Sequence, residues 1–115
     1  MDDEIETRRL NNWVSEPHEK LREGIASLLS RWIGLQMAVE NQWGGQDSVH
    51  KSHQLGADIF CWISQSKGRL HLEDIENLLH ETMLFSFNTE IEDGSIEEVA
   101  EQLMIMHEEY MHATY

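Results

Sequence analysis

The chain has 115 residues, of which 40% are hydrophobic, and its formal net charge is −14. This length fits one domain with a single core, and the apolar fraction excludes an intrinsically disordered chain. A lone cysteine, Cys61, excludes an internal disulfide, and no apolar run is long enough to span a bilayer. We therefore expect a soluble intracellular protein with no membrane contact.

The first part of the chain predicts an extension and then a long helix. Residues 1–15 are expected to form an N-terminal extension that is loose or a short extra helix, and residues 16–115 a single acidic helical domain. Ser15 or Glu16 is a candidate N-cap for the first main helix, with Pro17 in its first turn. Apolar residues then recur every three or four positions from residue 21 to residue 39, which predicts one continuous helix.

The end of this helix is marked by glycines. Gly44 and Gly45 follow the last apolar position, where a glycine in the left-handed conformation can end a helix. Ile33 and Met37 are expected to widen the apolar stripe. Trp43 lies beside the stop, and for this residue a place in the core and a contact with a partner are equally reasonable readings.

Three shorter patterns predict the remaining helices. The second helix begins at Asp47 or Ser48 and ends near Gln65, with Cys61 packed inside and Gly56 marking the close approach of another helix. The third begins near Leu72 and ends in an apolar run, Leu84, Phe85 and Phe87, which is expected to lie mostly in the core.

The last helix has a clear start signal. Ser95 and Glu98 are spaced as a capping box, in which the serine hydroxyl accepts the Glu98 N–H. A regular apolar stripe from Ile96 to Tyr110 follows. The pattern as a whole predicts an all-α fold, a compact bundle of four main helices joined by short connections.

The charge is divided unevenly along the chain. Ten Asp and Glu residues and all eight Lys and Arg residues lie within residues 1–69, whereas residues 70–115 contain twelve acids and no Lys or Arg. Such a surface repels nucleic acid and attracts basic proteins. Acidic helix faces that only confer solubility are the competing interpretation, although ordinary soluble helices mix both signs.

No catalytic or metal-binding pattern passes a spacing test. His107 and His112 are five residues apart, so they lie on different faces of a helix and do not match the zinc-protease motif. His50 and His53 could share a metal ion, but one pair of histidines on a helix without nearby cysteines is weak evidence for a metal site. The loop before residue 95 lacks the ligands of a calcium-binding EF-hand. We expect a non-enzymatic protein without cofactor or metal.

Two segments resemble a known family. Trp32 to Gly45 reads Trp-Ile-Gly-Leu-Gln-Met-Ala-Val-Glu-Asn-Gln-Trp-Gly-Gly, and Phe87 to Ile96 reads Phe-Asn-Thr-Glu-Ile-Glu-Asp-Gly-Ser-Ile. Both are similar to segments of the pre-rRNA-processing family named for its WGG motif. The resemblance implies a non-enzymatic escort that binds and shields a basic small-subunit ribosomal protein, numbered twenty-six. Such an escort frees this client from its import receptor, delivers it to the pre-ribosome in the nucleolus, and works in nucleus and cytoplasm.

The resemblance and the charge also suggest partner-binding residues. From the two motifs we carry over Glu40, Trp43, Gly44, Gly45, Glu92 and Asp93, and from charge alone we add Glu73, Asp74, Glu76 and Glu90. An alternative function is an acidic adaptor or nucleic-acid mimic that occupies another basic protein. Neither function requires direct binding of nucleic acid.

Overall fold

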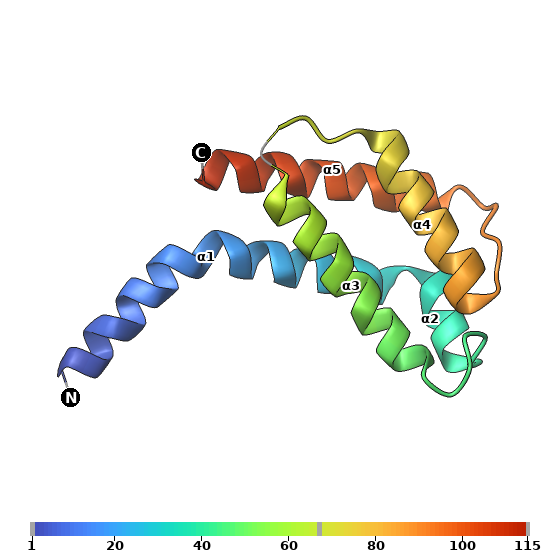
Figure 1. Ribbon diagram of the computed structural model, residues 1–115, viewed down its shortest axis with the longest axis horizontal. Coiled ribbons are helices and arrows are strands. Elements are labelled where there is room, and N and C mark those ends of the chain that lie inside the picture. Colours follow the sequence, from blue (N-terminus) through green and yellow to red (C-terminus); the bar gives the residue numbers. More distant parts are fainter. Residues whose placement is uncertain (1, 67, 115) are drawn as a thin grey trace.

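The computed structural model describes residues 2–66 and 68–114, with side chains described from Glu16 onward. These residues form α1 (Asp2–Arg31), α2 (Ile33–Glu40), α3 (Ser48–Gln65), α4 (Leu72–Phe87) and α5 (Ser95–Thr114), and none of them is in a strand (Figure 1). The predicted all-α fold is confirmed. The division at residue 15 stays a prediction because it falls on side chains outside the description. Pro17 lies inside α1 and not in a first turn.

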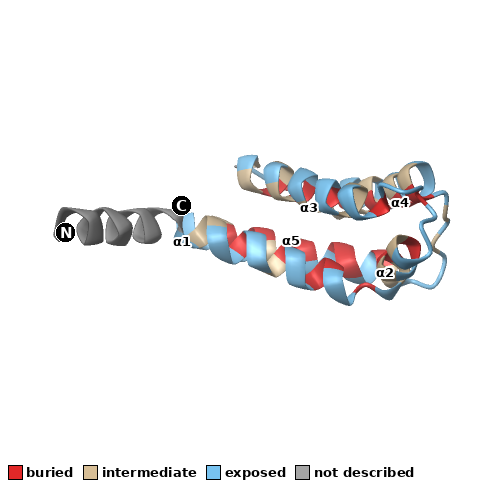
Figure 2. Cartoon of the chain, turned by 90° about the horizontal axis from the view of Figure 1, so that it is seen from below, coloured by how far each residue is buried: buried red, intermediate tan, exposed pale blue. Residues whose placement is uncertain are grey.

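The helices form two layers with the core between them. α3 and α4 make one layer, α1, α2 and α5 make the other, and the buried positions of each layer face the opposite one (Figure 2). α5 lies beside both α1 and α4, and α3 packs across α1 (Figure 1). In the part of the chain that the structure describes, no helix is both long and apolar enough to cross a bilayer.

The core is built from the apolar stripes that the sequence predicts. Burial of one large aliphatic side chain contributes about 1.5–3 kcal/mol, which is offset in part by the entropy lost on folding. The stripes therefore fix which face of each helix turns inward. The buried members of the predicted stripes are Leu21, Ile25, Leu28, Trp32 and Leu35, then Ile75, Leu79 and Met83, then Ile96, Val99, Leu103 and Tyr110.

The prediction of one continuous first helix is wrong at Trp32. This residue is extended, with φ −80° and ψ 102°, and it separates α1 from α2. Its indole is buried, and Nε1 donates a hydrogen bond to Ser95 Oγ at 2.9 Å. The Leu29 carbonyl accepts both the Trp32 N–H at 3.2 Å and Gln36 Nε2 at 3.0 Å, which ties α2 to the end of α1. Burial and these bonds outweigh the local helical periodicity.

The break changes which side chains are exposed. Because α2 leaves α1 at a new angle, Ile33 and Met37 lie at the surface, 73% and 45% exposed, instead of widening the core stripe. At the end of α4 only Phe87 is buried, whereas Leu84 and Phe85 are exposed. On a helix these two lie roughly 100° and 200° around the axis from the buried Met83, so they face away from the core.

Two expectations for α3 are also wrong. Cys61 is exposed instead of packed inside. A Cβ added at Gly56 would meet its nearest neighbour, Leu29 Cδ1, at an ordinary 3.6 Å, so this glycine does not mark a close helix approach. Both residues lie on the side of α3 that borders an open groove between α1, α2 and α3.

The start of α5 differs from the predicted capping box. The Ser95 hydroxyl accepts the Trp32 indole N–H, and the Glu98 N–H donates to the Gly94 carbonyl at 3.4 Å. Asp93 Oδ1 accepts the Ser95 N–H at 3.0 Å. The Ser95 hydroxyl thus bonds to Trp32 and not to the Glu98 N–H, and the carboxylate of Asp93 caps this helix end.

Candidate functional site

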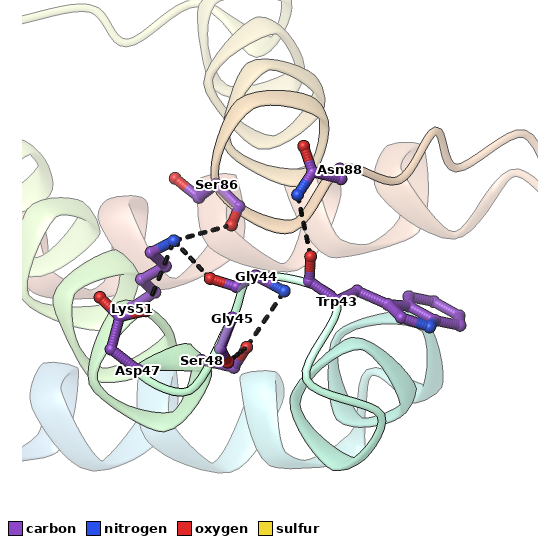
Figure 3. Close-up of polar contacts among 8 residues, drawn as sticks. All are labelled: Trp43, Gly44, Gly45, Asp47, Ser48, Lys51, Ser86 and Asn88. Carbon is purple, nitrogen blue, oxygen red and sulfur yellow. Dashed lines mark hydrogen bonds and ion pairs between the residues drawn. The ribbon is translucent and has the colours of Figure 1, made fainter.

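The Trp43-Gly44-Gly45 turn joins α2 to α3 and rests against the last turn of α4 (Figure 3). α2 ends in a Schellman motif, in which the Trp43 N–H donates to the Ala38 carbonyl and the Gln42 N–H to the Val39 carbonyl. Gln42 takes the left-handed conformation, with φ 54°. The expectation that a glycine ends this helix in the left-handed conformation is therefore wrong, because Gln42 takes that position.

The two glycines meet two different needs. Gly44 is buried where the turn comes closest to α4, and a Cβ there would lie 2.5 Å from the Ser86 carbonyl oxygen and 3.1 Å from the Phe87 ring. Gly45 has φ 95°, which other residues rarely adopt. Gly44 thus permits a close approach between segments, and Gly45 permits the backbone direction of the turn.

Lys51 fastens this turn to α4. Its Nζ donates to the Gly44 carbonyl at 2.5 Å and to the Ser86 carbonyl at 3.4 Å, and it pairs with Asp47 Oδ1 at 3.6 Å (Figure 3). Sequence reasoning missed this residue, although a signal was present. A cation in the first turn of α3 opposes the helix dipole, which indicates a tertiary reason for its position.

Two further side chains hold the turn. Ser48 Oγ accepts the Gly44 N–H at 3.1 Å and donates to the Gly45 carbonyl at 2.7 Å. Asn88 Nδ2, just after α4, donates to the Trp43 carbonyl at 2.9 Å. The backbone of the turn is therefore fixed by side chains from two neighbouring elements, independently of the Trp43 indole.

The connection from α4 to α5 is held at both ends by residues that flank α2. Asn88 holds the Trp43 carbonyl at one end, and Ser95 accepts the Trp32 indole at the other. Between these bonds, a Cβ added at Gly34 would lie 3.0 Å from Ile91 Cδ1, so the connection runs closely over α2. The two segments that resemble the WGG family therefore pack against each other.

We call the place where the Trp43-Gly44-Gly45 turn and α2 meet the connection of residues 88–94 the junction. It exposes one aromatic side chain and several acids. The Trp43 indole is 40% exposed and points away from the contact between Gly44 and Ser86 (Figure 3). The acids here are all exposed: Glu40 at the end of α2, and Glu90, Glu92 and Asp93 in the connection. None of these four carboxylates takes part in an ion pair with the described residues.

Ser95 links the buried and exposed sides of the junction. Hydrogen bonds from its side chain and its backbone N–H lower the pKa of the Asp93 carboxyl below the ordinary value of 3.8. Asp93 is therefore charged throughout the neutral range. The Trp32 indole on the same hydroxyl ties this exposed carboxylate to the break between α1 and α2.

The remaining acids of the predicted site lie elsewhere. Glu73 and Asp74 are exposed in the first turn of α4, and Glu76 is half-buried one turn further on. The junction contacts the other end of this helix, at Ser86 and Phe87, roughly 15–21 Å from these acids at 1.5 Å per residue. The structure brings together the motif residues and Glu90 but places Glu73, Asp74 and Glu76 in a separate region.

The chemistry available at the junction is recognition of positive charge. An exposed indole beside unpaired carboxylates suits Lys and Arg side chains, through ion pairs and cation–π contact. Over residues 16–66 and 68–114, no three His, Cys, Asp or Glu side chains converge in a way that would hold a metal ion.

Comparison with known proteins agrees with the motifs. Residues 21–101 match the family described as pre-rRNA-processing protein TSR2. The chain is 36% identical over 85 residues to the human TSR2 homolog, which covers 74% of this chain and 44% of that protein. It is 39% identical over 82 residues to the mouse homolog (71% and 42%) and 27% identical over 92 residues to the Saccharomyces cerevisiae protein (80% and 44%).

The chain thus spans less than half the length of these relatives. No solved structure matches it. The matched region contains both segments that meet at the junction, the WGG turn and the connection after α4. The chain belongs to the TSR2 family of pre-rRNA-processing proteins.

Proposed function

We propose that this chain acts in ribosome biogenesis as a non-enzymatic escort for the basic small-subunit ribosomal protein numbered twenty-six. It binds and shields this client, releases it from its import receptor and delivers it to the pre-ribosome, which supports maturation of small-subunit rRNA. Its work spans the nucleus, including the nucleolus, and the cytoplasm. Membership of the TSR2 family supports the role in pre-rRNA processing.

The observation that carries this proposal is the surface at the junction. Trp43 is exposed in the turn that follows Glu40, and Asn88, which binds its carbonyl, begins the connection that contains Glu90, Glu92 and Asp93. Tryptophan is among the residues that contribute most to protein interfaces, and a rigid support lowers the entropy cost of binding. The carboxylates of Glu40 and of the connection, which form no ion pair with the described residues, attract a Lys- and Arg-rich client.

Acidity also suits release of the client. Ion pairs with a basic protein weaken when another polyanion competes for the same cations, and rRNA supplies phosphates at high local density. An escort with this surface masks the basic residues of its client during transport and yields them to rRNA during assembly. The −14 net charge keeps the escort itself away from nucleic acid.

The first test is titration of this chain with the purified ribosomal protein at low and at physiological salt. A histone is the control for charge. The proposal predicts binding that survives physiological salt and is stronger than histone binding. Equal, weak binding of both proteins that salt abolishes would refute a dedicated client, and selective binding of another basic protein would favour the acidic adaptor.

Variants at the junction separate contact from folding. Trp43→Ala removes the exposed indole but leaves the carbonyl that accepts Asn88, and Glu40→Lys reverses an exposed charge. Each is expected to weaken client binding about tenfold or more with little change in helical content. Glu23→Lys, an exposed acid on α1, is the control for net charge. If all three variants bind alike, the junction is not the contact surface.

A further inference from the structure

The outer face of α2 exposes two large apolar side chains. Ile33 is 73% exposed and Met37, one turn later on the same face, is 45% exposed. Exposed aliphatic residues grouped on one face typically mark an interaction surface. The break at Trp32 turns this face outward, because a continuous helix would have directed it toward the core stripe.

A groove lies beside this face. It has a volume of about 510 Å³ and runs between the joint of α1 and α2 and the first turns of α5. Leu28, Trp32 and Val99 give it an apolar lining, and Ile33 borders it. A groove of this kind can receive an aliphatic side chain of a partner.

The groove is also strongly acidic. Asp93, Glu98 and Glu101 line it, all exposed, and none of them forms an ion pair within the described residues. The lining contains one cation, Arg31, whose Nε donates to the Ser27 carbonyl of its own helix. Glu98 and Glu101 lie on adjacent turns of α5, so their charges point along the same side of the groove.

We propose that this groove, with the exposed face of α2, docks a segment of the basic client in which an aliphatic side chain is flanked by Lys or Arg. The inference rests on the proposed function and goes further, because it names the docking segment and adds Ile33, Glu98 and Glu101, which the sequence did not suggest as partner-binding residues. The aliphatic side chain packs against Ile33. The flanking cations pair with Asp93, Glu98 and Glu101.

Charge distinguishes this groove from the larger one on the molecule. A groove of about 770 Å³ lies between α1, α2 and α3, and its lining contains no Asp or Glu. Arg22 lines it, 4.8 Å from the centre of the Phe60 ring. A basic segment gains no electrostatic attraction there, which assigns it to the acidic groove.

The first experiment compares two charge-neutralised variants of the same helix. Glu98→Gln with Glu101→Gln removes two carboxylates from the groove, whereas Glu108→Gln with Glu109→Gln removes two exposed carboxylates further along α5. Both double variants change the net charge equally. The proposal predicts about tenfold weaker binding of the ribosomal protein for the first pair and less than about twofold for the second. Equal losses would show a generic polyanion effect and overturn the proposal.

The second experiment tests the apolar contact. Ile33→Ser is compared with Val49→Ser, because Val49 is 56% exposed and lines the other groove. Neither residue is in the core, so both variants are expected to melt like the wild type. Ile33→Ser should weaken binding about tenfold at physiological salt, as burial of one aliphatic side chain implies. A loss with Val49→Ser instead would place the client in the other groove.

Synthetic peptides test the groove without the ribosomal protein. The probes are a peptide with one central Leu flanked by Lys and Arg, and the same peptide with Ser in place of Leu. Tighter binding of the Leu peptide, lost in Ile33→Ser, supports the groove. Equal binding of both peptides overturns it. If the ribosomal protein does not bind the wild-type chain, the proposed function is refuted. The peptides then still test whether the groove binds a basic segment with an aliphatic side chain.

The remaining alternative to test is that a second copy of the chain covers the exposed face of α2. Light scattering of the chain alone, across a range of concentrations, should report a monomer for wild type and for Ile33→Ser. A dimer that Ile33→Ser dissociates would assign the α2 face to a second copy of the chain and refute the docking of a basic segment.

Discussion

Replacing Gly44 with alanine should destabilise the fold through one steric conflict. The added Cβ would lie 2.5 Å from the Ser86 carbonyl oxygen and 3.1 Å from both Phe87 Cδ1 and Ser48 Oγ. The Ser86 oxygen belongs to the backbone of α4 and cannot rotate away, so the turn must separate from the helix. Overpacking of this kind costs about 1–3 kcal/mol, and disturbance of the Lys51 hydrogen bonds adds about 1 kcal/mol.

The expected loss in free energy of unfolding is therefore about 2–4 kcal/mol. For a domain of this size, that loss lowers Tm by roughly 8–16 °C. Urea unfolding followed by circular dichroism measures it directly. Gly68→Ala is the matched control, because an added Cβ there meets nothing within 4 Å. If Gly44→Ala unfolds within about 0.5 kcal/mol of wild type, the close approach between the turn and α4 does not exist.

Three other predictions test the fold and its charges. Lys51→Met should cost about 1–3 kcal/mol in urea unfolding because it leaves the Gly44 carbonyl without its donor, whereas Lys20→Met, at an exposed pair on α1, should be nearly neutral. Phe85→Ser should leave stability within about 0.5 kcal/mol of wild type, whereas Phe87→Ala should cost about 3–5 kcal/mol; equal effects would contradict the assigned burial. The carboxyl of Asp93 should titrate in NMR spectra below 3.8 and move toward that value in Ser95→Ala. Because its pKa is lower in the folded state, its contribution is present above the unfolded value and is lost as pH falls through the folded one.

Local signals in the sequence predict most of the helices. α3, α4 and α5 begin at Ser48, Leu72 and Ser95, as predicted from apolar periodicity and, for α3 and α5, from candidate capping residues, although the capping box at Ser95 does not form. Both signals act between residues a few positions apart, so a single sequence contains them. The burial of the predicted stripes follows from the same periodicity, since each helix turns its apolar face inward.

The predictions from sequence are wrong where contacts between residues far apart in the sequence determine the structure. The break at Trp32 depends on Ser95, 63 positions away in the sequence, and the tight fit at Gly44 depends on Ser86. No local pattern reports either contact. Phe85 illustrates a different limit: apolar character alone does not predict burial, because the helix phase set by Met83 turns Phe85 outward.

The same limit applies to the candidate site. A pattern such as Trp-Gly-Gly cannot distinguish residues that shape the turn from residues that face solvent, although the structure separates Gly44 from Trp43. Acidity predicts a basic partner but not which acids act together. Glu98 and Glu101 border a groove with Asp93, and their sequence pattern on α5 does not differ from that of other exposed acids on this helix.

The acidity that favours binding of a basic client also lowers the stability of the unbound chain. Like charges at a net −14 repel one another and destabilise a compact state. The fold opposes this repulsion where the two motif segments meet, through the Trp32 indole on Ser95, Asn88 on the Trp43 carbonyl, and Lys51 on Gly44. These contacts hold the acidic connection against α2 even though its carboxylates form no ion pair with the part of the chain that the structure describes. A basic client that supplies the missing cations would relieve the repulsion, so binding and stability are coupled at the junction.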